Sequence, residues 1–275
     1  MNLSKAFGSL ASLLLFWCMA GWSSASAAES FVGFINANDV APAEIGHLGG
    51  VRGRVLSADP QSGRMALIAE LPAGWSWDGA SATGQSLEIF VLAGKLEAEG
   101  TQLEPKGYLY VAPTASTPAL AARAGARLLV FAGPTGEPSG FTDWFMVEFD
   151  ESRWRPGLVG PSAGVDLPVE IFDLRRDPVT GARTWLAAIQ PGFEFPWERH
   201  SMVEEGFLVE GVYDLNECLP DGVKSGRYTA DGYFYRPANI LHGGPDSTAR
   251  SPSIWLFRSP ADLDVEFSDV CNPAP

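Results

Sequence analysis

The chain has 275 residues, 46% of them hydrophobic, and a formal net charge of -14 at pH 7. Such a charge repels phosphate backbones, and no cluster of lysine or arginine offsets it locally, which excludes nucleic acid as the expected partner. The length fits one large β domain or two domains of ordinary size, and an internal repeat decides between them.

Residues 1–28 have the organisation of a secretory signal peptide. Lys5 provides the positive charge, Leu10 to Ala20 form a short apolar core, and Ala25-Ser26-Ala27 supplies the small residues of a cleavage site. The apolar core is shorter than a membrane-spanning helix requires. We therefore expect a periplasmic or secreted protein that keeps no membrane segment after removal of the signal.

The rest of the chain contains an internal repeat. The stretch Leu56-Ser-Ala-Asp-Pro-Gln-Ser-Gly63 recurs as Leu174-Arg-Arg-Asp-Pro-Val-Thr-Gly181, 118 residues later. Three further pairs keep the same order: Glu88–Gly94 with Glu205–Gly211, Gly107–Tyr110 with Gly232–Tyr235, and Leu128–Phe131 with Ile254–Phe257. Chance similarity of turn motifs would not preserve this order and spacing.

Each repeat consists of short apolar runs separated by Asp-Pro, Pro-Gly and Gly-Tyr turns, which is typical of an antiparallel β sandwich or barrel. The sequence therefore predicts an all-β protein with two similar domains. We expect the first domain to cover residues 29–150 and the second to cover residues 151–275. The boundary falls in residues 150–167, which are rich in glycine, proline and serine.

Two cysteines, Cys218 and Cys271, remain after removal of the signal. In an oxidising compartment such a pair is expected to be bonded rather than free. The predicted disulfide joins the C-terminal tail to the segment after Tyr213. In the chain-entropy model, closing this loop stabilises the fold by roughly 4 kcal/mol.

The candidate chemistry lies in the second repeat, which contains two of the three histidines, His200 and His242. Residues two apart in a strand point the same way, so Glu198 and His200 can both face a barrel interior. Glu204 and His242 then approach from neighbouring strands. Such a mixed set of nitrogen and oxygen ligands suits a divalent ion of iron, manganese, nickel or zinc. The third histidine, His47, has no partner and is assigned no role.

The second repeat resembles the cupin superfamily, whose two motifs read G-x5-H-x-H-x3-4-E-x6-G and G-x5-P-x-G-x2-H-x3-N. The residues in register with the first motif are Gly192, His200, Glu204 and Gly211, and Glu198 stands at the place of its first histidine. Pro237 and His242 match the second motif, with Asn239 replacing its glycine and Asp246 at its asparagine. The resemblance implies a bicupin, with two tandem double-stranded β-helix (jelly-roll) barrels and a metal at Glu198, His200, Glu204 and His242.

Glu205 is the alternative to Glu204, because it aligns with Glu88 of the first repeat. The spacing in the family favours Glu204 as the ligand, and Glu198 and Glu205 are the candidate catalytic carboxylates. In the first repeat, the positions that correspond to residues 198, 200 and 242 are Ala80, Ala82 and Thr117 or Pro118, and none of these is a residue type expected to bind a metal. The first barrel is thus expected to lack the metal site.

Within the superfamily the chain resembles secreted bicupins of the DUF4437 group, which are related to the cupin-like domain of the anti-sigma factor ChrR. This resemblance implies a small-molecule ligand and leaves several functions open. The first is a metal-dependent enzyme of dioxygenase, isomerase or lyase type. The second is a non-catalytic periplasmic module that binds or senses a metal or small ligand, and the third is a structural bicupin. A homodimer is possible.

Overall fold

The structure, a computed structural model, describes residues 30–45, 50–157 and 169–273. They divide into two compact units, one from the described part of Ala41–Phe149 and the other from the described parts of Ala27–Val40 and Asp150–Pro275. Within these ranges, no helix has both the length and the apolar character needed to cross a membrane. The predicted signal peptide, residues 1–28, lies outside the described residues.

The first unit pairs a larger and a smaller antiparallel sheet. The larger sheet has the strand order β12 (Trp144–Val147), β9 (Tyr108–Val111), β6 (Leu87–Gly94), β11 (Ala126–Ala132), β4 (Met65–Leu71), β3 (Arg52–Ala58) and β2 (Ala43–Glu44). The smaller sheet has the order β5 (Trp75–Trp77), β10 (Leu120–Ala122), β7 (Leu96–Ala98) and β8 (Thr101–Leu103).

The second unit follows the same plan. Its larger sheet has the order β1 (Val32–Asn36), β20 (Gly232–Arg236), β17 (Glu204–Glu210), β23 (Ser253–Ser259), β15 (Arg183–Ile189), β14 (Val169–Arg176) and β13 (Arg155–Pro156). The other sheet has the order β19 (Gly222–Thr229), β18 (Val212–Leu219), β21 (Leu241–His242), β16 (Trp197–Arg199) and β24 (Glu266–Ser268), and β22 (Thr248–Ala249) pairs with β18. Two short 3-10 helices are η1 (Ala37–Asp39) and η2 (Glu151–Arg153).

The sequence repeat corresponds to a structural repeat. The order β9, β6, β11, β4, β3 in the first unit matches β20, β17, β23, β15, β14 in the second. The repeated Asp-Pro turn has the same construction in both units: the amides of Gly63 and Gly181 donate to the carbonyls of Asp59 and Asp177, at 2.8 and 3.0 Å. Both glycines have positive φ, a conformation that side chains other than glycine rarely adopt. The predicted all-β architecture is therefore confirmed.

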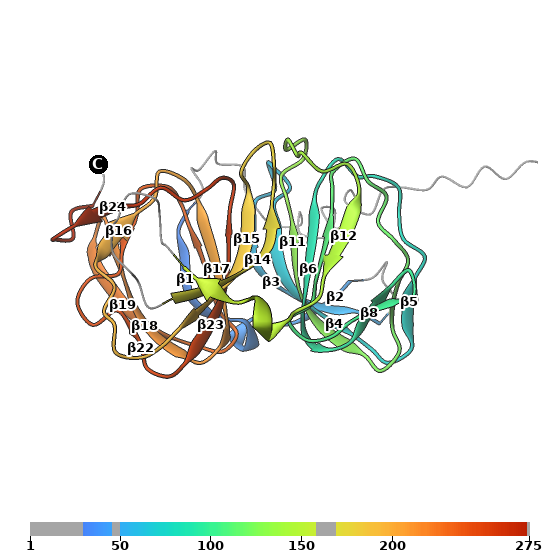
Figure 1. The fold of residues 1–275 in the computed structure, drawn as a ribbon, viewed down its shortest axis with the longest axis horizontal. Helices are drawn as coiled ribbons and strands as arrows, with labels where there is room; N and C mark the ends of the chain where they lie inside the picture. Colours follow the sequence, from blue (N-terminus) through green and yellow to red (C-terminus); the bar gives the residue numbers. More distant parts are fainter. Residues whose placement is uncertain (1–29, 46–49, 158–168, 274–275) are drawn as a thin grey trace, which may run out of the picture. The chain divides into compact units, whose positions relative to one another are not determined.

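The N-terminal strand β1 belongs to the second unit, although it precedes the first unit in the chain. It pairs with β20, and in Figure 1 the blue strand lies among the orange and red strands of the second unit. In the first unit the equivalent place beside β9 is filled by β12. The expected assignment of residues 29–150 to one barrel thus differs from the structure at its start, because a strand with no counterpart in the repeat crosses to the other barrel.

An aromatic core fills the space between the two sheets of the second unit. Trp255, which is almost fully buried, meets the rings of Tyr213, Tyr228, Phe234 and Phe257 at centroid distances between 5.3 and 5.7 Å. Aromatic side chains of this size dominate the burial of apolar surface in a core. The candidate functional residues lie against one side of this core.

Candidate metal centre

Glu198 and His242 face one another across the antiparallel pair of β16 and β21. His242 is also paired with Glu217 on β18, so β21 lies between two strands that each carry a carboxylate. Side chains directly opposite one another in such a pair share a face and lie close together. Here Nε2 of His242 lies 3.6 Å from Oε1 of Glu198.

The other two candidate ligands lie where the two sheets of the second unit approach each other. His200 directly follows β16, and Glu204 is the first residue of β17. Oε2 of Glu204 lies 3.9 Å from Nε2 of His200 and 3.7 Å from Nε2 of His242. One ligand atom from each of Glu198, His200 and His242 lies within 4.8 Å of the others. The structure therefore brings together all four residues that the sequence suggested as metal ligands.

Both imidazoles are oriented by backbone carbonyls. Nδ1 of His200 lies 2.5 Å from the carbonyl oxygen of Asp264, and Nδ1 of His242 lies 3.2 Å from that of Ile240. A carbonyl oxygen only accepts, so each Nδ1 must donate, and in the neutral ring Nε2 then carries the lone pair. Burial, together with the charge of Arg236, holds the pKa of His242 well below its usual value, which keeps that ring neutral.

Glu198 is a buried carboxylate with incomplete hydrogen bonding. Its Oε2 has no hydrogen-bond partner among the described residues, although the side chain is buried. Burial raises the pKa of Glu198, against the lowering effect of His200 and Arg236. A buried polar atom without a hydrogen-bond partner lowers the stability of the fold. Such an atom indicates that a bound group supplies the missing interaction.

Arg236 lies between two buried carboxylates. It donates through Nη1 to Oε2 of Glu204, and through Nη2 and Nε to the two oxygens of Glu217, at 2.6 and 3.0 Å. Burial opposes its charge, but Glu217 and Glu204 outweigh that effect and raise the pKa of Arg236. Burial also raises the pKa of Glu217, against the lowering effect of Arg236. The charge of Arg236 can stay buried because the carboxylates of Glu204 and Glu217 are both bonded to it.

Arg236 and Glu217 are functional residues that the sequence pattern did not indicate. Arg236 ends the apolar run Gly232–Tyr235, and a cation there was a signal that buried carboxylates must face it. Glu217 lies in the part of the second repeat that has no counterpart in the first, so the repeat gave no register for it. Only the pairing of β18 with β21 brings it to the site.

The four candidate metal ligands and Arg236 border a cavity of about 90 Å³ inside the second unit. A volume of this order holds several water molecules or one small ligand. Its walls are predominantly apolar, and its polar lining includes Glu198, His200, Glu204, Arg236 and His242. The apolar lining includes Ile171, Trp185, Phe234, Trp255, Phe257 and Leu263.

Glu205 does not lie with the other candidate site residues. Neighbouring residues of a strand point to opposite faces, so Glu204 faces the cavity while Glu205 faces away from it. Glu205 accepts hydrogen bonds from the hydroxyl of Tyr233 and from Nη1 of Arg258, the latter at 2.5 Å. The first unit repeats this pair, because the hydroxyl of Tyr108 donates to Glu88 at 2.5 Å. The shared arrangement indicates a structural role for Glu205 rather than the catalytic role expected from the sequence.

The first unit carries no ligand types at the equivalent positions among its described residues. Ala80 bridges to Thr117 where the second unit pairs Glu198 with His242. Leu87 pairs with Val111 where the second unit pairs Glu204 with Arg236. The backbone frame is thus common to both units, and the chemistry depends on the side chains of the second.

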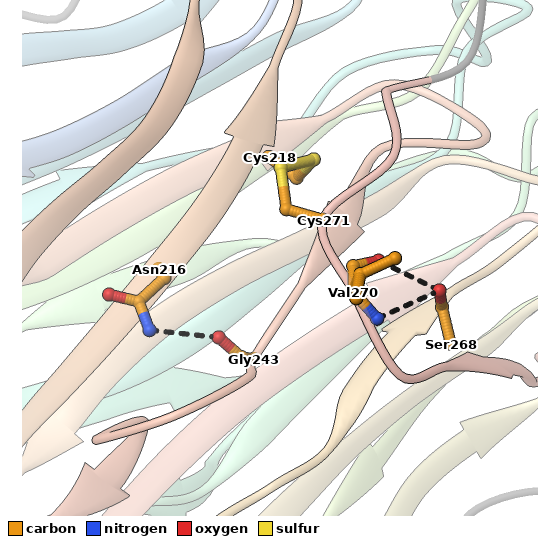
Figure 2. Close-up of a disulfide and its surroundings, with 6 residues drawn as sticks. All are labelled: Asn216, Cys218, Gly243, Ser268, Val270 and Cys271. Atoms are coloured by element: carbon orange, nitrogen blue, oxygen red, sulfur yellow. Dashed lines mark hydrogen bonds between the residues drawn. A yellow bond between two sulfur atoms is a disulfide. The ribbon is translucent and has the colours of Figure 1, made fainter.

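The predicted disulfide between Cys218 and Cys271 is confirmed, with a Cα separation of 5.5 Å. Figure 2 shows it beside Asn216, whose Nδ2 donates to the carbonyl of Gly243 at 3.0 Å. The two cysteines pack with Trp197 and Leu241 in a small buried cluster. Trp197, Leu241 and Cys218 are direct sequence neighbours of Glu198, His242 and Glu217. The disulfide therefore lies behind the strands that present the site.

Neither a protein-family model nor a protein of curated function matches this sequence. Several solved structures share its fold. A candidate dioxygenase from Nostoc punctiforme is 18% identical, with a TM-score of 0.62 over 90% of this chain and 87% of that chain. Protein Ylba from E. coli (DUF861) is 15% identical, with a TM-score of 0.62 over 89% of this chain and 97% of that chain. An oxalate decarboxylase from Lactobacillus farciminis is 12% identical, with a TM-score of 0.57 over 89% and 90% of the two chains.

These similar structures are cupin-type proteins, and at such identities the likeness concerns the fold. The chain accordingly has the bicupin fold, with two jelly-roll barrels, as the sequence predicted. A possible metal site of glutamate and histidine lies in the second barrel.

Proposed function

We propose that this chain is an exported, metal-dependent enzyme whose second barrel holds one divalent transition-metal ion and acts on a small molecule. One observation carries the proposal. Nε2 of His242, an acceptor in the neutral ring, faces carboxylate oxygens of Glu198 and Glu204 at 3.6 and 3.7 Å. Acceptors facing acceptors in a buried site repel one another unless a proton or a metal ion lies between them, and a metal ion satisfies both imidazoles and the carboxylates at once.

The donor set fits such an ion. Glu198, His200 and His242 would hold it, with Glu204 adjoining, and two nitrogens with carboxylate oxygens suit iron, manganese, nickel or zinc. The carbonyls that fix both Nδ1 atoms are the outer-sphere supports that metal-binding histidines usually have. When bound, the ion would supply Lewis-acid or redox chemistry to the substrate, which is consistent with dioxygenase, isomerase or lyase reactions.

The chain's own residues have separate tasks in this proposal. Glu204 is held in place by Arg236, which donates to its Oε2, and its side chain lines the cavity, where the carboxylate can accept a proton from a bound substrate. The aromatic walls formed by Trp185, Trp255 and Phe257 exclude water from the reacting group. The first barrel serves as a scaffold.

We further propose that the chain is related to the secreted bicupins of the DUF4437 group and to the ChrR-like cupin domains. The support is the stretch Val203–Gly206 and the run Tyr233–Pro237 followed by His242. Export is supported by the composition of residues 1–28 and is compatible with the disulfide. Cell fractionation followed by N-terminal sequencing, with a mature end near residue 29, tests the export proposal.

Metal content is the direct test of the site. Wild-type protein dialysed against manganese, iron(II), nickel or zinc is expected to retain about one ion per chain for at least one of these metals. The variant His200→Ala/His242→Ala should retain none. His47→Ala, which also removes an imidazole, is the matched control and should bind like the wild type. Equal metal content in all three proteins would remove the site.

Turnover is tested on the loaded protein. Oxygen uptake or product formation with members of a panel of small carbonyl, hydroxy and enol compounds, lost in the double variant, supports an enzyme. Metal retention without turnover under any condition favours the alternative, a module that binds or senses a small ligand.

A further inference from the structure

The charges of the proposed metal site balance once a divalent ion is bound, before any substrate enters. The cluster holds three buried carboxylates, those of Glu198, Glu204 and Glu217, and one buried guanidinium, that of Arg236. Together they leave two negative charges when all are ionised, which one divalent cation cancels. When the charges of a buried site already cancel, an added anion gains no net electrostatic attraction there. Burying the charge of that anion then costs free energy.

The positive charge of Arg236 is already paired with two glutamates. Of the described residues that line the cavity, Arg236 is the only arginine or lysine. Its Nη1 is bonded to Glu204, and its Nη2 and Nε are bonded to Glu217. Its plane also lies over the ring of Phe234, with Cζ 4.1 Å from the centroid. Three of its five N–H donors are therefore bonded to glutamates, and a carboxylate entering the cavity would have to share the guanidinium with two carboxylates already bound to it.

The remaining walls favour an apolar body. Trp185, Trp255, Phe257 and Leu263 line the cavity away from the charged cluster. Tyr213 also lines it, and burial raises the pKa of that phenol, so Tyr213 is uncharged there. An uncharged, compact molecule buries apolar surface against these walls without losing the hydration of a charge.

Resting on the proposed metal site, we infer that the second barrel takes a small, uncharged, predominantly apolar molecule that presents one carbonyl or hydroxyl oxygen to the metal. The same geometry selects against carboxylates. Glu204 is a specificity-determining residue in this scheme, because its carboxylate takes the Nη1 donor of Arg236 and places a negative charge on the cavity wall where a substrate anion would otherwise bind.

A matched pair of probes tests this inference by binding alone. Benzamide and benzoate have nearly the same shape, and each offers an oxygen ligand, but only benzoate is charged. Their dissociation constants are measured by calorimetry on the zinc-loaded protein at pH 7.5. A free zinc ion prefers the carboxylate, so an expected preference of the wild type for benzamide, by tenfold or more, reflects the cavity. The variant Glu204→Gln removes a negative charge and leaves Arg236 facing a neutral amide, and should shift the ratio at least tenfold toward benzoate.

Controls separate this inference from the proposed function. Glu210→Gln, at the exposed end of the same strand as Glu204, should leave the ratio unchanged. Glu217→Gln should shift it as Glu204→Gln does, which covers the case that one variant folds poorly. Zinc content is measured on the same samples, and a wild type without zinc counts against the metal site itself. A zinc-loaded wild type that prefers benzoate, or that binds neither probe, overturns this inference and leaves the metal site standing.

Discussion

Glu198 and His242 occupy the same cross-strand position in the second barrel that Ala80 and Thr117 occupy in the first. The two barrels therefore provide a matched comparison within a single chain. On the backbone frame that both units share, the second barrel has four site residues at positions where the first barrel has small or apolar ones. These four are Glu198, Glu204, Arg236 and His242. This relationship supplies internal controls for variants of the metal site.

The variant His242→Ala is expected to weaken metal binding by more than about 100-fold, since the loss of a direct ligand should exceed the 10- to 100-fold cost of losing an outer-sphere partner. Thr117→Ala changes the equivalent position of the first barrel and should leave the affinity unchanged. Competition with a chromogenic chelator measures both. Similar affinities for the two variants would place the metal elsewhere.

Arg236→Ala is expected to destabilise the protein by about 3–5 kcal/mol, because it leaves the carboxylates of Glu204 and Glu217 buried without a partner. The triple variant Arg236→Met/Glu204→Gln/Glu217→Gln removes all three charges and should recover much of that loss. Urea unfolding at pH 7 measures the free energies. If Arg236→Ala is as stable as the wild type, the buried ion pairs are not formed as described.

Asp214 gives the second barrel a pH-dependent contribution to stability. Hydrogen bonds from Arg227 and Arg250 lower the pKa of its carboxylate, against the raising effect of burial. A carboxylate with a depressed folded-state pKa stabilises the fold above its unfolded value of 3.8, and this contribution is lost as the pH falls through the folded value. Both arginines are largely exposed, so the contribution is only about 1 kcal/mol.

The variant Asp214→Asn should therefore be less stable than the wild type at pH 7, and the difference should be smaller near pH 2.5, below the unfolded value of 3.8. Denaturant unfolding at the two pH values measures this difference. A gap in stability that stays the same at both would contradict the ionic origin of the contribution.

The positions of Glu198 and His200 could be predicted because strand alternation depends only on a spacing of two residues. The cysteine pair could be predicted because only one pairing was available after removal of the signal. Glu204 and Glu205 could not be separated with certainty by counting, since a shift of one residue in the alignment exchanges them. The alternation within β17 separates them, because Glu205 bonds to Tyr233 and Arg258 on the far face.

Arg236 and Glu217 were missed for a different reason. Their contact depends on which strands are neighbours and in what register, and the sequence carries no local signal for the pairing of β18 with β21. The crossing of β1 to the second barrel was missed because a strand of five residues without a counterpart in the repeat gives no indication of its partner.

Replacing both Cys218 and Cys271 with serine is expected to lower the stability of the second unit by up to about 4 kcal/mol, given the 53-residue separation. The disulfide packs with Trp197 and Leu241, directly behind Glu198 and His242. We therefore expect metal affinity to fall as well, by about 10- to 100-fold, as for other outer supports of metal ligands. Urea unfolding and metal titration of the wild type and the double-serine variant measure the two effects, and equal metal affinities would show that the disulfide does not support the site.

The crossing of β1 to the second barrel can be tested through Phe34 and Gly226. The ring of Phe34 stacks on Tyr228 at 5.1 Å and lies so close to Gly226 that an added Cβ would come within 2.1 Å of it. Gly226→Ala should therefore displace the ring and cost about 1–3 kcal/mol through overpacking. Phe34→Ala should also destabilise the second unit, because it removes the stacked ring.

In the double variant Phe34→Ala/Gly226→Ala, the methyl group added on β19 occupies space that the ring of Phe34 has vacated. The loss of stability should then be smaller than the sum of the two single losses by at least about 0.5 kcal/mol. Val223→Ala, at an exposed position on the same strand as Gly226, is the control and should combine additively with Phe34→Ala. Urea unfolding of all variants measures the coupling. Additive losses for Phe34 and Gly226 would mean that the N-terminal strand does not pack on β19, and that the second barrel closes without it.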